Sequence, residues 1–290
     1  MKFGIAFANA GPLSDPTLAV ATARAAEAAG FESLWTVEHV LVPVGYESEY
    51  PYDPSGKIPG GDEIDIPDPL IWMAYVAAVT STIKLGTGIL IVPQRNPAVV
   101  AKEVATLDQL SGGRVLLGVG VGWLEEEFAA LGVPFKDRGR RLDSHIATMR
   151  ALWTQDKATV DDAFTSFSNC VSLPKPVNGT VPVVIGGHSE PAARRAGRLG
   201  DGFFPGKGSH DELAHLLDVM RAAAEQAGRD PDAIEITASG AGLFNSDPMA
   251  ELEKLTALGV HRAIIAPLAY DVASTEDVYG AWAEGIITPS

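Results

Sequence analysis

The sequence has one cysteine and few positive charges for its length. Because Cys170 stands alone among 290 residues, neither a disulfide framework nor a cysteine-cluster metal site can be built from this chain. Lys and Arg total 22 against 37 Asp and Glu, which gives a net charge of −15. Phosphate backbones and anionic lipid attract cationic proteins, so this charge argues against nucleic-acid and membrane partners.

Long apolar runs and common hydrolytic or metal motifs are also missing. No stretch approaches the roughly 18 uninterrupted apolar residues of a membrane span, and the start MKFGIAFANAGPLSDP lacks a signal peptide's apolar region. With the single cysteine, this predicts a cytoplasmic protein. The motifs H-E-x-x-H and G-x-S-x-G are absent, so we expect neither a zinc site nor a serine hydrolase.

Short β-branched runs alternate with Ala- and Leu-rich amphipathic segments, a pattern typical of βα units and a parallel sheet. Asp15-Pro16, Asn96-Pro97 and Asp247-Pro248 are helix-start signals, and Ser209 with Glu212 fits a capping box. We expect one α/β domain over residues 1–290, a (β/α)8 TIM barrel. Its eight strands are predicted at Lys2–Ala8, Ser33–Val37, Ile83–Val92, Arg114–Val121, Val181–Ile185, Asp201–Pro205, Glu235–Ser239 and Arg262–Ala266.

An open, doubly wound sheet is the alternative architecture. Its support is GVGVGW at Gly118–Trp123, which resembles a dinucleotide-binding loop. The G-x-G-x-x-G spacing fails there, because Trp123 stands where the third glycine belongs. The stretch also lies mid-chain rather than in the first βα unit, so the barrel is favoured.

Two insertions interrupt the βα rhythm. Residues 41–66, after the second strand, are too long and too rich in Pro, Gly and Tyr for an ordinary connection, which predicts a lid or substrate wall on the catalytic face. Residues 155–180, before the fifth strand, predict a short hairpin.

Sites in a TIM barrel lie at the carboxyl ends of the strands. Here those ends are mostly small or glycine-rich, which favours a flat ligand close to the backbone. The Gly186–Pro191 stretch pairs glycines with a helix start at Ser189, a pattern that favours a phosphate-type anion. His39 is the leading acid/base candidate, with neighbouring Glu38 as the carboxylate that would tune it.

The stretch IKLGTGILIVPQRNPAVVAKEVATLDQLSGGRVLLGVGVGWLEEE at 83–127 closely resembles the luciferase-like monooxygenase superfamily. The resemblance continues through FKDRGRRLD at 135–143, LPKP at 173–176 and VPVVIGGHSEPAARRAGRLGDGFFP at 181–205. It covers nearly the whole chain, more loosely after residue 210. The pattern looks most like the actinobacterial branch that uses the deazaflavin coenzyme F420.

The resemblance implies roles for particular residues. Glu38-His39 matches an acidic residue and a histidine near the reactive carbon, Gly88-Ile89 matches a non-prolyl cis peptide behind the ring, and Gly186-Gly187 match backbone donors to the phosphate. We also assign Gly120 and His188 to the cofactor site and Phe7 and Trp123 to the substrate pocket. Trp123 replaces a Glu of the F420-dependent glucose-6-phosphate dehydrogenases, which makes sugar-phosphate oxidation doubtful and favours an apolar or aromatic substrate.

The cofactor determines which reaction the residues serve. With F420 we expect hydride transfer to or from a small organic substrate, with His39 moving the proton; with FMN we expect oxygenation. A non-catalytic flavin-binding protein is the alternative from another class. Arg95, Arg138 and Lys207 are candidates for binding the acidic F420 tail. Members of the family are often dimers, so a homodimer is an open option, and the substrate stays unidentified.

Overall fold

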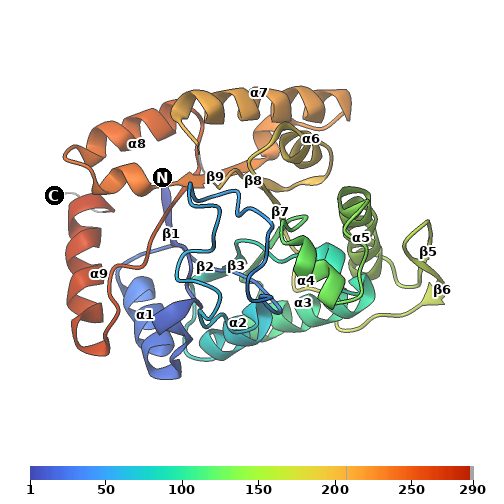
Figure 1. Cartoon of the computed structure of the whole chain (residues 1–290), viewed down its shortest axis with the longest axis horizontal. Coiled ribbons are helices and arrows are strands. Elements are labelled where there is room, and N and C mark those ends of the chain that lie inside the picture. The colour runs from blue at the N-terminus through green and yellow to red at the C-terminus, as the bar shows by residue number, and fades with distance from the viewer. Residues whose placement is uncertain (207, 288–290) are drawn as a thin grey trace.

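A computed structural model of the chain describes residues 1–206 and 208–287. Eight parallel strands close into a barrel in the order β1-β10-β9-β8-β7-β4-β3-β2 (Figure 1). Their bounds are β1 Lys2–Ile5, β2 Ser33–Thr36, β3 Lys84–Thr87, β4 Val115–Val119, β7 Val183–Gly186, β8 Gly202–Phe204, β9 Glu235–Ser239 and β10 Arg262–Ile265. Each lies in a predicted strand or ends within one residue of it.

Closure of the sheet excludes the open alternative. The first and last strands pair in parallel, with Lys2 opposite Arg262 and Ile5 opposite Ile265. A doubly wound sheet would leave those two strands as separate edges. The expected (β/α)8 TIM barrel is therefore confirmed, and the glycines of Gly118–Trp123 serve the fourth strand and its loop.

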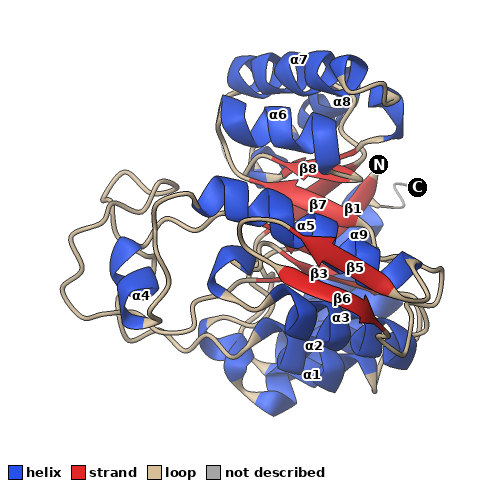
Figure 2. Ribbon diagram, turned by 90° about the vertical axis from the view of Figure 1, so that its right-hand side faces the viewer, coloured by secondary structure: helices blue, strands red, loops and turns tan. Residues whose placement is uncertain are grey.

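Helices follow every barrel strand and cover its outer face (Figures 1 and 2). The predicted helix starts hold, because Asp15, Asn96 and Asp247 each accept hydrogen bonds from first-turn amides and Ser209 forms a complete capping box with Glu212. The helices are α1 Pro16–Ala28, α2 Pro69–Ala77, α3 Pro97–Ser111, α4 Glu125–Ala130, α5 Arg138–Thr154, α6 Glu190–Leu199, α7 His210–Gln226, α8 Pro248–Ala257 and α9 Val272–Ile286. Among these described helices, none combines the length and apolar character needed to cross a bilayer.

The barrel interior is filled by side chains around Trp35. This indole is 1% exposed and clusters with Leu116, Val184 and Ile264. A Cβ on Gly86 would lie 2.8 Å from the indole ring, so the glycine in β3 makes room for the tryptophan. The interior is thus a packed core, and any site must lie at an end of the barrel.

The two insertions lie outside the barrel sheet. Strands β5 Ala158–Asp161 and β6 Ser166–Cys170 pair as an antiparallel hairpin outside the barrel. The long loop at 41–66 crosses the barrel opening in Figure 1, and Figure 2 shows it beside α4 at one end of the molecule. The carboxyl ends of the barrel strands lie at that same end.

Candidate active site

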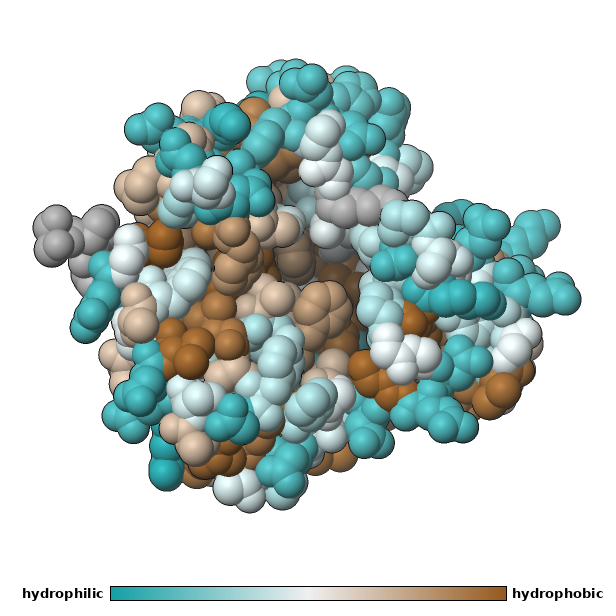
Figure 3. All heavy atoms as spheres, turned by 60° about the vertical axis from the view of Figure 1, so that its left-hand side comes forward, coloured by the Kyte–Doolittle hydropathy of each residue, from teal (hydrophilic) through white to brown (hydrophobic). Residues whose placement is uncertain are grey.

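A cavity of about 1020 Å³ opens at the carboxyl ends of the barrel strands. The space-filling view shows a hollow in one face, with apolar side chains gathered around it (Figure 3). The residues predicted for catalysis, the cofactor ring and phosphate, and the substrate pocket all line this cavity: Phe7, Glu38, His39, Gly88, Ile89, Gly120, Trp123, Gly186, Gly187 and His188. The volume is at the upper end for small-molecule sites and suits a cofactor with a substrate beside it.

His39 is bonded to a carboxylate that the sequence interpretation missed. Its Nδ1 lies 3.0 Å from Oε2 of Glu127, a residue 88 positions later in the first turn of α4. The ring also meets Trp123 edge to face, with centroids 5.7 Å apart. Packing and hydrogen bonding therefore fix the imidazole at the cavity wall.

Glu38 has a different partner from the one we expected. The sequence interpretation took it as the carboxylate that tunes His39, but its side chain forms an ion pair with Arg95 and accepts from the Ile91 N–H. Burial raises the pKa of Glu38, and the Arg95 guanidinium and the Ile91 N–H oppose that shift. Neighbours in sequence therefore have different partners here: Glu38 binds Arg95, and His39 binds Glu127.

Arg95 was a candidate for the acidic cofactor tail, and the structure gives it other partners. It binds Glu38 and also Asp68, whose carboxylate lies 2.9 Å from the guanidinium. Its charge is thus neutralised within the protein. Arg138 does line the cavity, stacked 3.7 Å from the Phe135 ring centroid. Lys207, the third candidate, lies outside the described residues.

The third strand is interrupted at Gly88-Ile89, where the peptide bond is cis, as the resemblance implied. A single bridge from Leu90 to Val119 then resumes the ladder, so β3 ends earlier than predicted. The Ile89 side chain explains two rim glycines. A Cβ would lie 2.5 Å from it at Gly120 and 2.3 Å at Gly186. From the sequence we expected these glycines to make room for a flat ligand. At these two positions they make room for the Ile89 side chain.

The amino end of α6 borders the same cavity. Ser189 caps this helix by accepting from the Ala192 N–H, as predicted. The Gly187 N–H, expected to bind phosphate, instead donates to the Phe204 carbonyl at 3.2 Å. Burial raises the pKa of Tyr52, and a hydrogen bond with the His188 backbone opposes that rise. Through this bond the loop at residues 41–66, called the lid below, reaches the amino end of α6.

Arg195 adds positive charge to this side of the cavity. It projects from α6, lines the cavity and pairs with Asp143 of α5. Sequence reasoning missed it because an arginine within a helix is usually solvent-exposed. Among the described residues, no group of His, Cys, Asp and Glu that could hold a metal ion occurs.

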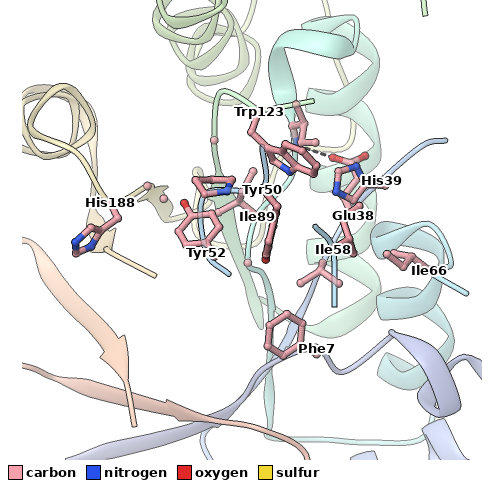
Figure 4. Close-up of a pocket in the computed structure, with 18 of the residues that line it drawn as sticks. Phe7, Glu38, His39, Tyr50, Tyr52, Ile58, Ile66, Ile89, Trp123 and His188 are labelled. Atoms are coloured by element: carbon pink, nitrogen blue, oxygen red, sulfur yellow. Dashed lines mark hydrogen bonds between the residues drawn. The ribbon is translucent and has the colours of Figure 1, made fainter. Parts of the chain in front are cut away.

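The lid supplies the apolar wall that its composition predicted. Tyr50 packs edge to face on both Trp123 and Tyr52, at centroid distances of 5.2 Å and 5.5 Å. Figure 4 shows His39 and His188 on opposite sides, with Tyr50, Tyr52 and Ile89 between them. Further apolar side chains complete the wall: Phe7, Ile58, Ile64 and Ile66.

Curated relatives include proteins with and without an assigned activity. An uncharacterised protein of Mycobacterium tuberculosis is 35% identical over 223 residues, 77% of each chain. An F420-dependent glucose-6-phosphate dehydrogenase of Nocardia farcinica is 38% identical over 196 residues, which is 64% of this chain and 57% of that protein. A protein of the same name from Kineococcus radiotolerans is 31% identical over 79% of this chain and 64% of its own length.

Solved structures share the whole fold. A monooxygenase from Streptomyces bottropensis matches with a TM-score of 0.78 at 21% identity, covering 99% of each chain. An F420-dependent secondary alcohol dehydrogenase, solved with an F420-acetone adduct, also has a TM-score of 0.78, at 20% identity over 97% of each chain. The family model described as luciferase-like monooxygenase matches residues 1–286. The chain therefore belongs to the luciferase-like monooxygenase family, whose members include F420-dependent oxidoreductases and monooxygenases.

Proposed function

We propose that this protein is an F420-dependent oxidoreductase that transfers hydride to or from a small apolar organic substrate, with His39 as the acid/base. The observation that carries the proposal is a single cavity wall holding a fixed histidine among aromatic and aliphatic side chains. The relatives named F420-dependent glucose-6-phosphate dehydrogenases favour F420 over FMN. When bound, F420 supplies two-electron hydride chemistry.

The residues around the cavity fit such a cofactor. Gly88-Ile89 would lie behind its ring, and Gly120, Gly186, Gly187 and His188 would border it. Arg138 and the amino end of α6 provide positive potential for its phosphate and acidic tail, and Arg195, which is paired with Asp143, borders the same part of the cavity. The only acid in the first turn of α6, Glu190, is paired with Arg194 and His215, which offsets its charge.

The substrate side of the cavity favours a neutral molecule. The sequence resemblance places Trp123 where the F420-dependent glucose-6-phosphate dehydrogenases have a glutamate. The indole packs against His39, Tyr46 and Tyr50. Phe7 lies across the cavity from it in Figure 4, and the isoleucines of residues 41–66 add further apolar surface. We therefore propose an activated alkene, ketone or alcohol with an apolar or aromatic body as the substrate.

The first experiment is a pair of fluorescence titrations of the purified protein, one with oxidised F420 and one with FMN. Micromolar or tighter F420 binding with weak FMN binding is the expected result. The reverse would replace the proposal with an FMN-dependent monooxygenase, which the description of the family also covers. If the protein binds neither cofactor, the roles proposed for Gly88, Gly186 and Gly187 are overturned.

A second experiment distinguishes an enzyme from a flavin-binding protein without turnover. We expect His39→Ala to abolish oxidation of reduced F420 by the probe 2-cyclohexenone while the F420 dissociation constant stays unchanged. Loss of a positioned acid/base typically lowers kcat about 10²- to 10⁴-fold. Unchanged turnover would remove His39 from the reaction.

We also propose that the protein forms a homodimer. Exposed apolar side chains occur on α2 and α3, two helices that pack side by side: Ile71, Tyr75, Val99 and Leu110. Sedimentation equilibrium should give twice the chain mass of 30.5 kDa. A monomer at all concentrations would contradict this proposal and leave the cavity unaffected.

A further inference from the structure

Glu127 is a buried carboxylate beside the cavity whose place in the reaction is unassigned. It belongs to the first turn of α4, and its side chain is 0% exposed. Removing a carboxylate from water is costly unless donors surround it. The partners of its two oxygens therefore show what holds it in place.

Both oxygens of Glu127 have donors. Oε1 accepts from the Val40 N–H at 2.7 Å and the Leu41 N–H at 3.3 Å, while Oε2 faces His39 Nδ1 at 3.0 Å. Burial by itself raises the pKa of Glu127, but its hydrogen bonds, the one with His39 foremost, outweigh burial and lower the pKa overall. The group is therefore an anion that can only accept hydrogen bonds.

An anionic acceptor at Nδ1 determines the tautomer of the ring. Nδ1 must carry the proton that Glu127 accepts, which leaves Nε2 as the nitrogen for reacting groups. His39 lines the cavity, and its ring plane is held against Trp123 at 86°. We infer that Glu127 is a positioning residue: it fixes the tautomer and orientation of His39 so that Nε2 is presented to the substrate. This inference rests on the proposed acid/base role of His39.

A plain structural role for Glu127 is the competing explanation, because Val40 and Leu41 form the start of the lid. The neighbouring Glu126 offers a matched comparison. It accepts from the backbone N–H groups of Glu47 and Ser48 and from the Ser48 hydroxyl at 2.6 Å. Both carboxylates thus anchor the lid, while the described contacts to His39 come from Glu127.

The decisive substitution is Glu127→Gln, with Glu126→Gln as its control. A glutamine at 127 keeps one carbonyl oxygen for the Val40 N–H, so the lid stays anchored. Its NH₂ group would face Nδ1 as a donor, which favours the opposite tautomer of His39. Long-range ¹H–¹⁵N spectra of histidine-labelled protein report which ring nitrogen of the neutral ring is protonated, without any cofactor or substrate. The His39 signals are assigned with His39→Asn.

We expect a proton on Nδ1 of His39 in the wild type and in Glu126→Gln, and on Nε2 in Glu127→Gln. The wild-type spectrum is informative even if a variant does not fold, since a proton on Nε2 there would overturn the inference. An unchanged tautomer in folded Glu127→Gln would overturn it as well.

Turnover gives the second readout, with reduced F420 and 2-cyclohexenone as the probes. Glu127→Gln should lower kcat about 10- to 100-fold, by analogy with the loss of carboxylates that orient metal-bound histidines, with F420 affinity unchanged. Glu126→Gln should stay within about twofold of the wild type. Equal losses in both variants would show that lid anchoring accounts for the effect.

The two proposals can fail separately. Suppose the tautomer is reversed in Glu127→Gln, but the wild type neither binds F420 nor oxidises it with 2-cyclohexenone. That result supports the positioning of His39 and overturns the proposed function alone.

Discussion

The two ends of the barrel both contain buried charge, and they use it differently. At the amino end of the strands, Arg262 is 1% exposed, pairs with Glu32 and Glu235, and lies over the Trp35 ring. At the carboxyl end, Glu127 holds His39, which also borders a cavity. Buried charges at both ends find partners within the protein, but at the second end the ring of His39, our proposed acid/base, also borders the cavity. The proposed function thus places stability and reactivity at opposite ends of the barrel.

The largest expected effect is at the amino end. Arg262→Met should lower the free energy of unfolding by about 3 kcal/mol, because Glu32 and Glu235 lose their buried partner and keep only the exposed Lys84 and Lys2. Urea denaturation measures this loss, and F420 affinity of the folded protein should be unchanged. Arg140→Met, which removes an exposed pair with Asp137, serves as the control and should cost at most about 1 kcal/mol. Equal losses of unfolding free energy in Arg262→Met and Arg140→Met would show that the buried charge at the amino end does not stabilise the protein more than a surface ion pair does.

The same ion pair predicts a pH dependence. Burial opposes the charged form of Glu32, but hydrogen bonding and charge from Arg262 outweigh it and lower the pKa of Glu32 from 4.5 to about 2. Because the folded pKa is depressed, its stabilisation is present above pH 4.5 and is lost as pH falls toward 2. Urea midpoints of the wild type should fall across this window. In Arg262→Met the Glu32 contribution to that fall should become smaller, because only the Ser33 hydrogen bond and the charge of Lys84 then lower its pKa.

At the carboxyl end, Gly186→Ala should cost about 2 kcal/mol and weaken F420 binding, since its Cβ would clash with Ile89. The double variant with Ile89→Ala should recover much of the stability. Gly280→Ala in α9 is the matched control, because a Cβ there meets nothing within 4 Å and should be neutral or stabilising. A failure of Ile89→Ala to relieve the defect would argue that the glycine serves the ligand directly.

The smallest effect concerns the lid. Tyr52→Phe removes the hydroxyl that bonds to the His188 backbone, which should weaken lid attachment by about 1 kcal/mol. Hydrogen exchange within residues 41–66 should then become faster, while global unfolding stays unchanged. Tyr75→Phe in α2 removes a hydroxyl outside residues 41–66 and keeps the apolar ring of the proposed dimer surface, so it should change neither. Unaltered exchange would show that aromatic packing alone holds the lid.

Local sequence patterns determined the elements of this protein. Alternation of β-branched and amphipathic segments, Asp-Pro and Asn-Pro helix starts and the spacing of the strands predicted the barrel, because these signals act within a few residues. They also predicted where His39 would lie, since a barrel gathers the carboxyl ends of its strands. The extra length and the Tyr, Pro and Gly content of residues 41–66 indicated a cavity wall.

Tertiary structure decided which residues act on each other. The carboxylate that binds His39 is 88 residues away, and Glu38 pairs with Arg95 across 57 residues. Ile89 occupies the space left by Gly120, just after β4, and by Gly186, at the end of β7. Such pairs depend on the register between strands and on how far each loop turns a side chain. Neither quantity is encoded within a short stretch of sequence. The sequence therefore indicated where the candidate site lies, and the tertiary structure determined which side chains contact each other there.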